Sequence, residues 1–197
     1  MYSIVQDIKA ELRANMNGVA SAIMRTAGMT ADYRVNFGVE LPRIMYIAKN
    51  EIDMMLPADR PAGEAKAELA QMLWNESVRE CRILATWLYP PERMSHDLAD
   101  LWADGIRTAE LAQIAALNLF SKIPEASTLA FRWIAAEAEM KQICGFYTVC
   151  HILRNRRLSD RSADELRDQV AAAMLSDNSQ LRTAAEKVGR EMEDSAF

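Results

Sequence analysis

Six basic side chains lie near the starts of four apolar segments with helical periodicity, where they could bind phosphate groups. Every segment contributes at least one of them: Arg79, Arg82, Arg107, Lys141, Arg182 and Lys187. Cations that are spaced one structural repeat apart can follow the phosphates of a nucleic-acid backbone, and each neutralised phosphate adds salt-dependent affinity. The pattern therefore predicts a nucleic-acid-binding surface.

Carboxylates accompany these bases and leave a second interpretation open. Glu80, Glu110 and Glu186 are close in sequence to a base, so the charges could pair on solvated helix faces. The chain also has 23 basic and 28 acidic residues, a net charge of -5, whereas binding to nucleic acid by charge alone needs an excess of bases. A surface of mixed charge would instead take a peptide or a partner helix, so a non-catalytic protein-interaction solenoid is the alternative function.

The sequence contains no recognisable set of groups for nucleophilic, metal or cofactor chemistry. His96 precedes an acidic segment and His151 lies in an apolar one, and neither has a nucleophile nearby in sequence. Cys81, Cys144 and Cys150 lack the spacing of a metal site or a disulfide framework, so we expect buried, reduced thiols. No phosphate-binding loop or dinucleotide fingerprint is present. We therefore predict no cofactor and no metal.

The composition predicts an all-α protein. Half of the 197 residues are hydrophobic and 26% are charged, which is the balance of a compact domain with a real core. Only 7 Gly and 6 Pro stand against many good helix formers, which is too few turn residues for a many-stranded sheet. No apolar run reaches the roughly 18 residues of a membrane helix, and the first residues lack a secretory pattern. We therefore expect a cytoplasmic protein without membrane contact.

An internal repeat organises the apolar segments into helix pairs. Three predicted helices end in a similar Leu-Ala…Trp pattern, at residues 69–74, 98–102 and 129–133. A short joint and a second helix follow each of them, at residues 78–88, 111–120 and 140–153. A fourth pair, Ser162–Leu175 and Ser179–Met192, lacks the Trp and opens with the capping box Ser162-Ala163-Asp164-Glu165. We expect core positions for the recurring tryptophans, and core or turn packing for the remaining one: Trp74, Trp102 and Trp133, then Trp87.

The N-terminal part precedes these pairs and predicts a helical cap over residues 1–27. Ser3 can cap a first helix, whose buried face would be formed by Ile4, Val5, Ile8 and Leu12. A second helix is predicted over Val19–Thr26. Gly28–Glu40 then resembles a connector, before a helix over Arg43–Met55 and a loop over 56–63.

Two-helix units cannot bury their apolar stripes alone, so neighbouring pairs must stack. This predicts an α-α superhelix, a HEAT-like repeat solenoid that forms a single domain over residues 1–197, with its repeats at about 41–193. In such a solenoid the second helix of each pair lines the concave surface. Because the six basic residues belong to these second helices or to the joints before them, the prediction is that they share one groove.

Three ordered motifs resemble those of a known family. They are Tyr33-(x)3-Phe37-Gly38-Val39-(x)2-Pro42, Leu73-Trp74-(x)4-Arg79-Glu80, and Trp133-Ile134-Ala135 followed by a helix with Gln142. Their order and spacing resemble the AlkD-type DNA alkylation repair proteins over roughly residues 20–193. The resemblance implies HEAT-like repeats and a DNA glycosylase-like activity, in which positively charged alkylated purines are removed from duplex DNA held in the concave groove.

The resemblance also locates the family's site on this sequence. In the family, a Trp and an Asp one turn apart on an inner helix, with a second Trp on a later inner helix, embrace the deoxyribose of the lesion, and an Arg assists at the backbone. The Asp stabilises the sugar cation as the glycosidic bond breaks. The matching positions here are Ala109, Gln113, Gln142 and Lys187. A one-residue shift places the first two at Glu110 and Ile114 instead.

These positions have lost the residue types of the family, so the fold could persist while the excision disappears. Losing one group that stabilises developing charge raises the reaction barrier by about 3 to 4 kcal/mol. Glu110 is the one local carboxylate that could substitute as a catalytic group. The sequence thus predicts a DNA alkylation repair-like protein that binds duplex or damaged DNA.

Overall fold

The computed structural model describes residues 1–30, 32–154 and 160–194, and most of these residues are helical. This confirms the all-α prediction, because the described residues contain just one isolated parallel bridge, between Val35 and Val78. The chain divides into two compact units, Met1–Arg93 and Met94–Phe197. No helix within the described ranges is long and apolar enough to span a membrane. The single domain over residues 1–197 stays a prediction.

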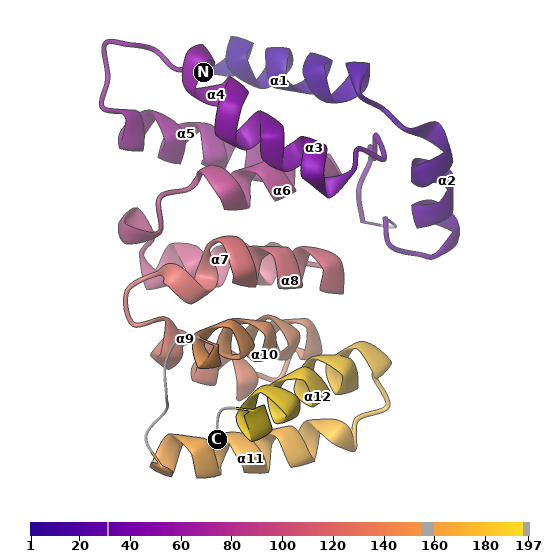
Figure 1. The fold of residues 1–197 in the computed structure, drawn as a ribbon, viewed down its shortest axis with the longest axis vertical. Helices are drawn as coiled ribbons and strands as arrows, with labels where there is room; N and C mark the ends of the chain where they lie inside the picture. Colours follow the sequence, from indigo (N-terminus) through magenta and orange to yellow (C-terminus); the bar gives the residue numbers. More distant parts are fainter. Residues whose placement is uncertain (31, 155–159, 195–197) are drawn as a thin grey trace. The chain divides into compact units, whose positions relative to one another are not determined.

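The first unit contains two layers of helices. In chain order its elements are α1 (Tyr2–Ala14), α2 (Gly18–Thr26), α3 (Leu41–Tyr46), a π-helical turn (Ile47–Glu51), α4 (Ile52–Met55), α5 (Ala62–Trp74) and α6 (Arg79–Leu88) (Figure 1). The α3 helix, the π-helical turn and α4 follow one another without a break and confirm the predicted helix Arg43–Met55. The α5 helix packs against α1 and α6, and α6 packs against α3 and the π-helical turn. We call the layer of α3, α4 and α6 the inner layer of this unit, because it holds the later helix of each pair.

The α1 helix shows how the apolar pattern sets this packing. Its predicted stripe, Ile4, Val5, Ile8 and Leu12, is buried. The predicted cap is wrong, because the helix begins at Tyr2 and Ser3 lies inside its first turn. The α2 helix does have a side-chain cap, since the Asn17 Oδ1 atom accepts a hydrogen bond of 3.0 Å from the Ala20 N–H.

A buried carboxylate holds the connector between α2 and α3 against the start of α6. The Glu80 side chain is fully buried and accepts hydrogen bonds from three successive backbone N–H groups, of Phe37 (3.2 Å), Gly38 (3.0 Å) and Val39 (3.3 Å). The Arg79 guanidinium lies 3.2 Å from the same carboxylate and donates to the Val39 carbonyl at 3.3 Å. The first two family motifs therefore meet in space, because one provides the carboxylate and the other provides the N–H groups that bind it.

Gly38 is a residue of this connector that cannot be replaced without strain or a clash. Its φ is 70°, in the left-handed region that favours glycine. A Cβ atom at this position would lie 2.3 Å from the Asn17 carbonyl oxygen and 2.6 Å from the Ser21 nitrogen. The glycine in the family-like motif thus allows the connector to approach the start of α2.

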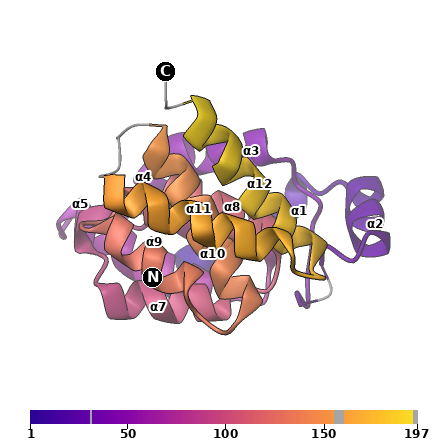
Figure 2. The ribbon, with the colours of Figure 1, turned by 90° about the horizontal axis from the view of Figure 1, so that it is seen from below.

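The second unit also has two layers. Its helices are α7 (His96–Gly105), α8 (Ala109–Asn118), α9 (Ala126–Ile134), α10 (Glu139–Leu153), α11 (Asp160–Met174) and α12 (Ser179–Asp194). The inner layer of this unit consists of α8, α10 and α12, with α10 packed between the other two. The α9 helix packs on α10, and α11 lies beside α12 (Figures 1 and 2). The predicted helix pairs are confirmed, but the predicted cap at Ser162 is wrong, because α11 already begins at Asp160.

The recurring tryptophans lie in the cores of the two units, as predicted. Trp74, Trp102 and Trp133 are 6%, 2% and 0% exposed. The Trp133 indole donates a hydrogen bond of 2.6 Å from Nε1 to Asp100 on α7, and its ring meets the edge of Phe120 at a centroid distance of 4.9 Å. The tryptophan thus joins the end of one outer helix to the neighbouring outer helix.

Replacing Gly145 by Ala should destabilise the second unit. A Cβ atom at this position on α10 would lie 2.8 Å from the Ala130 carbonyl oxygen and 2.8 Å from the Ile134 nitrogen, both on the backbone of α9. The two helices must then separate, which costs about 1 to 3 kcal/mol of unfolding free energy in a packed core. Urea unfolding followed by circular dichroism measures this. Gly189→Ala is the matched control, because its Cβ would be 3.7 Å from a Val170 methyl group, and it should be neutral or stabilising.

Replacing Glu80 by Gln should loosen the first unit. The amide removes the negative charge that lies beside the buried Arg79 guanidinium, and it offers one acceptor oxygen to three N–H groups. Breaking a buried ion pair on one side typically costs about 3 to 5 kcal/mol. Glu76→Gln is the control, because its ion pair with Lys9 is partly exposed and should contribute about 1 kcal/mol or less. Equal losses of unfolding free energy in the two variants would contradict this role of the Glu80 carboxylate.

Candidate nucleic-acid interface

The same hydrogen bond recurs where an outer helix turns into an inner helix. The fourth residue of α6, α10 and α12 donates a side-chain hydrogen bond to a carbonyl oxygen two residues after the preceding helix ends. The three bonds are Arg82 to Glu76 (3.4 Å), Gln142 to Ala136 (2.6 Å) and Arg182 to Ser176 (2.6 Å). Each gives a hydrogen-bond partner to a backbone carbonyl of the turn, which lies outside both helices. Arg82 and Arg182 therefore have a structural role in their turns.

The turn between α7 and α8 is stabilised by a different set of hydrogen bonds. Here the fourth residue of the inner helix is Ala112, which is buried and has no polar group. Arg107, within the turn itself, donates to the Asp104 carbonyl at 2.6 Å and to the Ile106 carbonyl at 3.3 Å. Arg107 is exposed, so its guanidinium still faces solvent while it stabilises the turn.

Two further basic residues lie away from a common inner surface. Arg79 is 1% exposed and paired with Glu80, so its guanidinium is held inside the first unit, and its binding to phosphate stays a prediction. Lys141 lies in the first turn of α10, and its ammonium is 2.8 Å from Asp104 and 3.6 Å from Asp100. Both carboxylates belong to the outer helix α7, so Lys141 is neutralised from the outer layer.

Two positions that the resemblance assigned to the family's site do come together in the second unit. The Lys187 ammonium on α12 lies 3.4 Å from the Gln113 Oε1 atom on α8. It also lies 5.1 Å from the centroid of the Tyr147 ring on α10, at a cation-π distance. Lys187 forms no ion pair with any residue that the structure describes. We call Gln113, Tyr147 and Lys187 the inner cluster.

The other predicted site residues flank this cluster or lie outside it. Ala109 and Glu110 are half-buried in the first turn of α8, and Glu110 engages a neighbouring group. Gln142 lines a separate pocket of about 350 Å³ with residues of α9, α10, α11 and α12 and of the loops between them, including Glu139 at the start of α10 and Ser176 after α11. The structure therefore brings Gln113 and Lys187 together but directs the Gln142 amide into its own turn.

The electrostatic surroundings of the cluster are mixed. Burial raises the pKa of the Tyr147 hydroxyl, so the ring stays neutral. Burial also lowers the pKa of His151, one turn further along α10, and the nearby charge of Arg154 lowers it further. Lys122 and Lys187 add to this effect, and Glu191 opposes it. Burial and these cations together favour the neutral form of His151.

The cysteines are unsuited to chemistry. All three are free and buried, which confirms the prediction. Burial raises the pKa of Cys81 and of Cys144 to about 12, and it raises the pKa of Cys150 as well, so the reactive thiolate form is suppressed. In the part of the chain that the structure describes, no three His, Cys, Asp or Glu side chains are placed to hold a metal ion.

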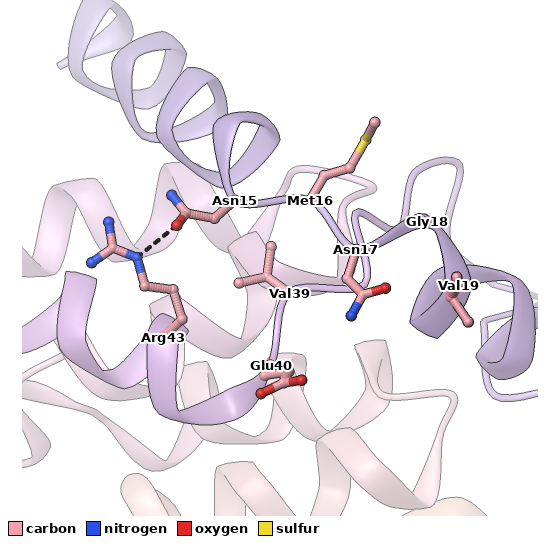
Figure 3. A pocket seen from close by; sticks show the side chains of 8 residues that line it. All are labelled: Asn15, Met16, Asn17, Gly18, Val19, Val39, Glu40 and Arg43. Atoms are coloured by element: carbon pink, nitrogen blue, oxygen red, sulfur yellow. Dashed lines mark hydrogen bonds between the residues drawn. The ribbon is translucent and has the colours of Figure 1, made fainter.

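The first unit has a pocket of about 680 Å³ where α1 ends and where α2 and α3 begin (Figure 3). Arg43 points toward Asn15 across this pocket, with 3.0 Å between Nε and Oδ1. The same guanidinium lies 2.5 Å from Glu11 and 2.9 Å from Glu51, so its charge is already balanced. The basic side chain that lines this pocket is therefore already paired within the chain.

Sequence reasoning missed an aromatic side chain on the inner layer of the first unit. Trp87, which was predicted to pack in the core or a turn, is half-buried, and the ammonium of the exposed Lys49 lies 5.1 Å from the centroid of its ring. In the sequence, Trp87 could have been found from its position in its helix, which matches the positions of other residues in neighbouring helices. Counted from the first residue of α3, α6, α10 and α12, the ninth residues are Lys49, Trp87, Tyr147 and Lys187.

The comparisons with known proteins agree with this architecture. One solved structure, with a TM-score of 0.80 and 22% sequence identity, covers 97% of this chain and 76% of its own chain. It is described as "A new family of proteins related to the HEAT-like repeat DNA glycosylases with affinity for branched DNA structures". This likeness confirms the HEAT-like repeat fold. None of the curated proteins matches the chain. The model of the family described as DNA alkylation repair enzyme matches residues 8–187, and the chain belongs to this family.

Proposed function

We propose that this protein binds DNA through the inner layer of its second unit and does not excise alkylated bases. One observation carries the proposal. The Lys187 ammonium occupies the face of the Tyr147 ring and is bonded to the Gln113 amide. The positions that resemble the family's site thus hold a cation and an amide, where the family has an aromatic ring and a carboxylate.

This arrangement is unfavourable for the family's substrate. A positively charged alkylated purine would meet the Lys187 ammonium at the ring face on which a cation could otherwise stack. The Gln113 amide carries no negative charge to stabilise a sugar cation, and removal of one such electrostatic group typically slows a reaction by about 10² to 10³. Glu110 is half-buried and already engaged, so it is a poor replacement.

The same arrangement is favourable for a phosphate. An ammonium without a counter-ion gains both a charge and hydrogen bonds when it contacts a phosphate oxygen, and Gln113 can orient it. The exposed Arg107 precedes α8 and offers a second cation in the same unit. The structural neighbour is described as having affinity for branched DNA, which supports DNA as the ligand class here.

A protein partner is the second candidate function, and one observation favours it. The α2 helix exposes Val19 and Ile23, one helical turn apart, at 73% and 64%. Adjacent exposed apolar side chains of this kind occur at protein interfaces. This function predicts a surface that binds a polypeptide and has no affinity for DNA at low salt.

Lys187→Gln should weaken DNA binding. Loss of one phosphate contact should lower the affinity by about 3-fold to 10-fold, and should reduce the slope of log affinity against log salt by about 1. Fluorescence anisotropy of the full chain with a blunt duplex and a four-way junction, at about 50 and about 200 mM salt, measures both quantities. Lys141→Gln is the matched control, because it makes the same charge change at a residue that pairs with the outer helix. Equal losses in the two variants, or no binding of either DNA by the wild type, would contradict the proposal.

Release of N7-methylguanine from a methylated duplex should be no faster with the wild-type protein than in buffer. The physical reason is that the inner cluster lacks a carboxylate and carries a resident positive charge. Chromatography of the released base measures the rate, and Glu110→Gln is the control. If the wild type releases the base and Glu110→Gln abolishes the release, the proposal that the protein does not excise alkylated bases is wrong. Catalysis would then be assigned to the Glu110 carboxylate.

A further inference from the structure

The inner layer of the first unit contains a lysine that lies in a π-helical turn and contacts an aromatic ring. The helix that begins as α3 widens into a π-helical turn over Ile47–Glu51, where the Ile52 N–H donates to the Ile47 carbonyl five residues back. Such π-helical turns are rare and are frequently found at functional sites. Lys49 lies within this turn and is exposed, and its ammonium lies 5.1 Å from the centroid of the Trp87 ring on α6.

Trp87 differs from the other tryptophans of the chain. Trp74, Trp102 and Trp133 are at most 6% exposed and fill the cores, whereas Trp87 keeps part of its ring at the surface. Among the residues that the structure describes, Lys49 forms no ion pair. Lys49, a cation without an ion-pair partner among the described residues, therefore lies over the half-buried ring of Trp87.

A second exposed ring lies one helical turn before Lys49. Tyr46 is 51% exposed, although it lies on the same helix as the buried Ile44 and Ile47. The Arg43 guanidinium lies 5.0 Å from the centroid of its ring. Because Glu11 and Glu51 balance the charge of Arg43, the free positive charge at this surface comes from Lys49.

We infer that Trp87, Tyr46 and Lys49 form a stacking platform for unpaired nucleotides of DNA. An aromatic ring at the surface stacks on any base, and each stacked base contributes about 1 to 3 kcal/mol in proteins that bind single strands. A rotamer change moves the Lys49 ammonium off the ring face, where it can contact the phosphate of the same nucleotide. Bases within a blunt duplex are stacked on one another, so the rings select unpaired nucleotides.

The inference rests on the proposed DNA binding and deepens it. The inner cluster of the second unit offers a phosphate contact that any DNA can use, whereas the platform of the first unit adds the preference for unpaired nucleotides. Charge complementarity favours DNA over a protein at this surface, because the free charge beside the two rings is positive and lacks a partner.

The test compares a blunt duplex, a forked duplex with unpaired arms and an oligothymidine, each labelled with fluorescein and titrated with the full chain. Trp87→Leu and Lys49→Gln should each lower the affinity for the forked duplex and for oligothymidine by about tenfold, and for the blunt duplex by about twofold or less. Lys187→Gln serves as the comparison and should lower the affinity for all three. Lys49 is exposed, so its variant tests the platform even where Trp87→Leu loses stability.

Tryptophan fluorescence of the wild type provides a second readout. Oligothymidine should quench it through Trp87, because the other three tryptophans are buried, and Trp87→Leu should remove the quenching. Equal losses for blunt and forked duplexes in the two platform variants, or unquenched fluorescence in the bound wild type, would overturn the platform and leave DNA binding intact. Absence of wild-type binding to all three DNA molecules would overturn the proposed function and the platform together.

Discussion

The side chain at the fourth position of an inner helix ties that helix to the end of the outer helix before it. This bond has the same spacing in three of the turns, Arg82 to Glu76, Gln142 to Ala136 and Arg182 to Ser176. Because an α-helix rotates each residue by a constant angle, fixing the fourth residue also fixes where the ninth one points. Trp87, Tyr147 and Lys187 occupy the ninth positions of α6, α10 and α12, so the directions of these three side chains depend on the turns.

The buried Glu80 carboxylate provides a comparable constraint for the first unit. It binds three backbone N–H groups of the connector and the neighbouring Arg79, so it holds a segment without regular structure against α6. The family-like motifs around Gly38 and Glu80 therefore record a structural requirement of the fold. A protein can retain both motifs for this structural reason while the residues of its functional site change.

The distribution of charge follows from the same contacts. Bases that were expected to line one groove instead stabilise a turn, pair with an outer helix or lie buried, as Arg182, Lys141 and Arg79 illustrate. Lys187, which was one of the expected bases, and Lys49, which was not, each lie over an aromatic ring without a counter-ion among the described residues. A cation-π pair holds the ammonium in place without neutralising it, so these two lysines stay available for phosphate.

The sequence by itself determined the helical class, the helix pairs and the buried tryptophans, because apolar periodicity and repeat spacing are local properties of the chain. It also placed Gln113 and Lys187 at matching positions through the family resemblance. Only the tertiary structure decided which basic side chains of the inner helices have an ion-pair partner. Arg79 and Lys187 are both bases on inner helices, and their sequence contexts do not distinguish them. Their surroundings differ because packing brings each of them a different partner that is distant in the chain. Arg79 meets the Val39 carbonyl, whereas Lys187 meets the Tyr147 ring.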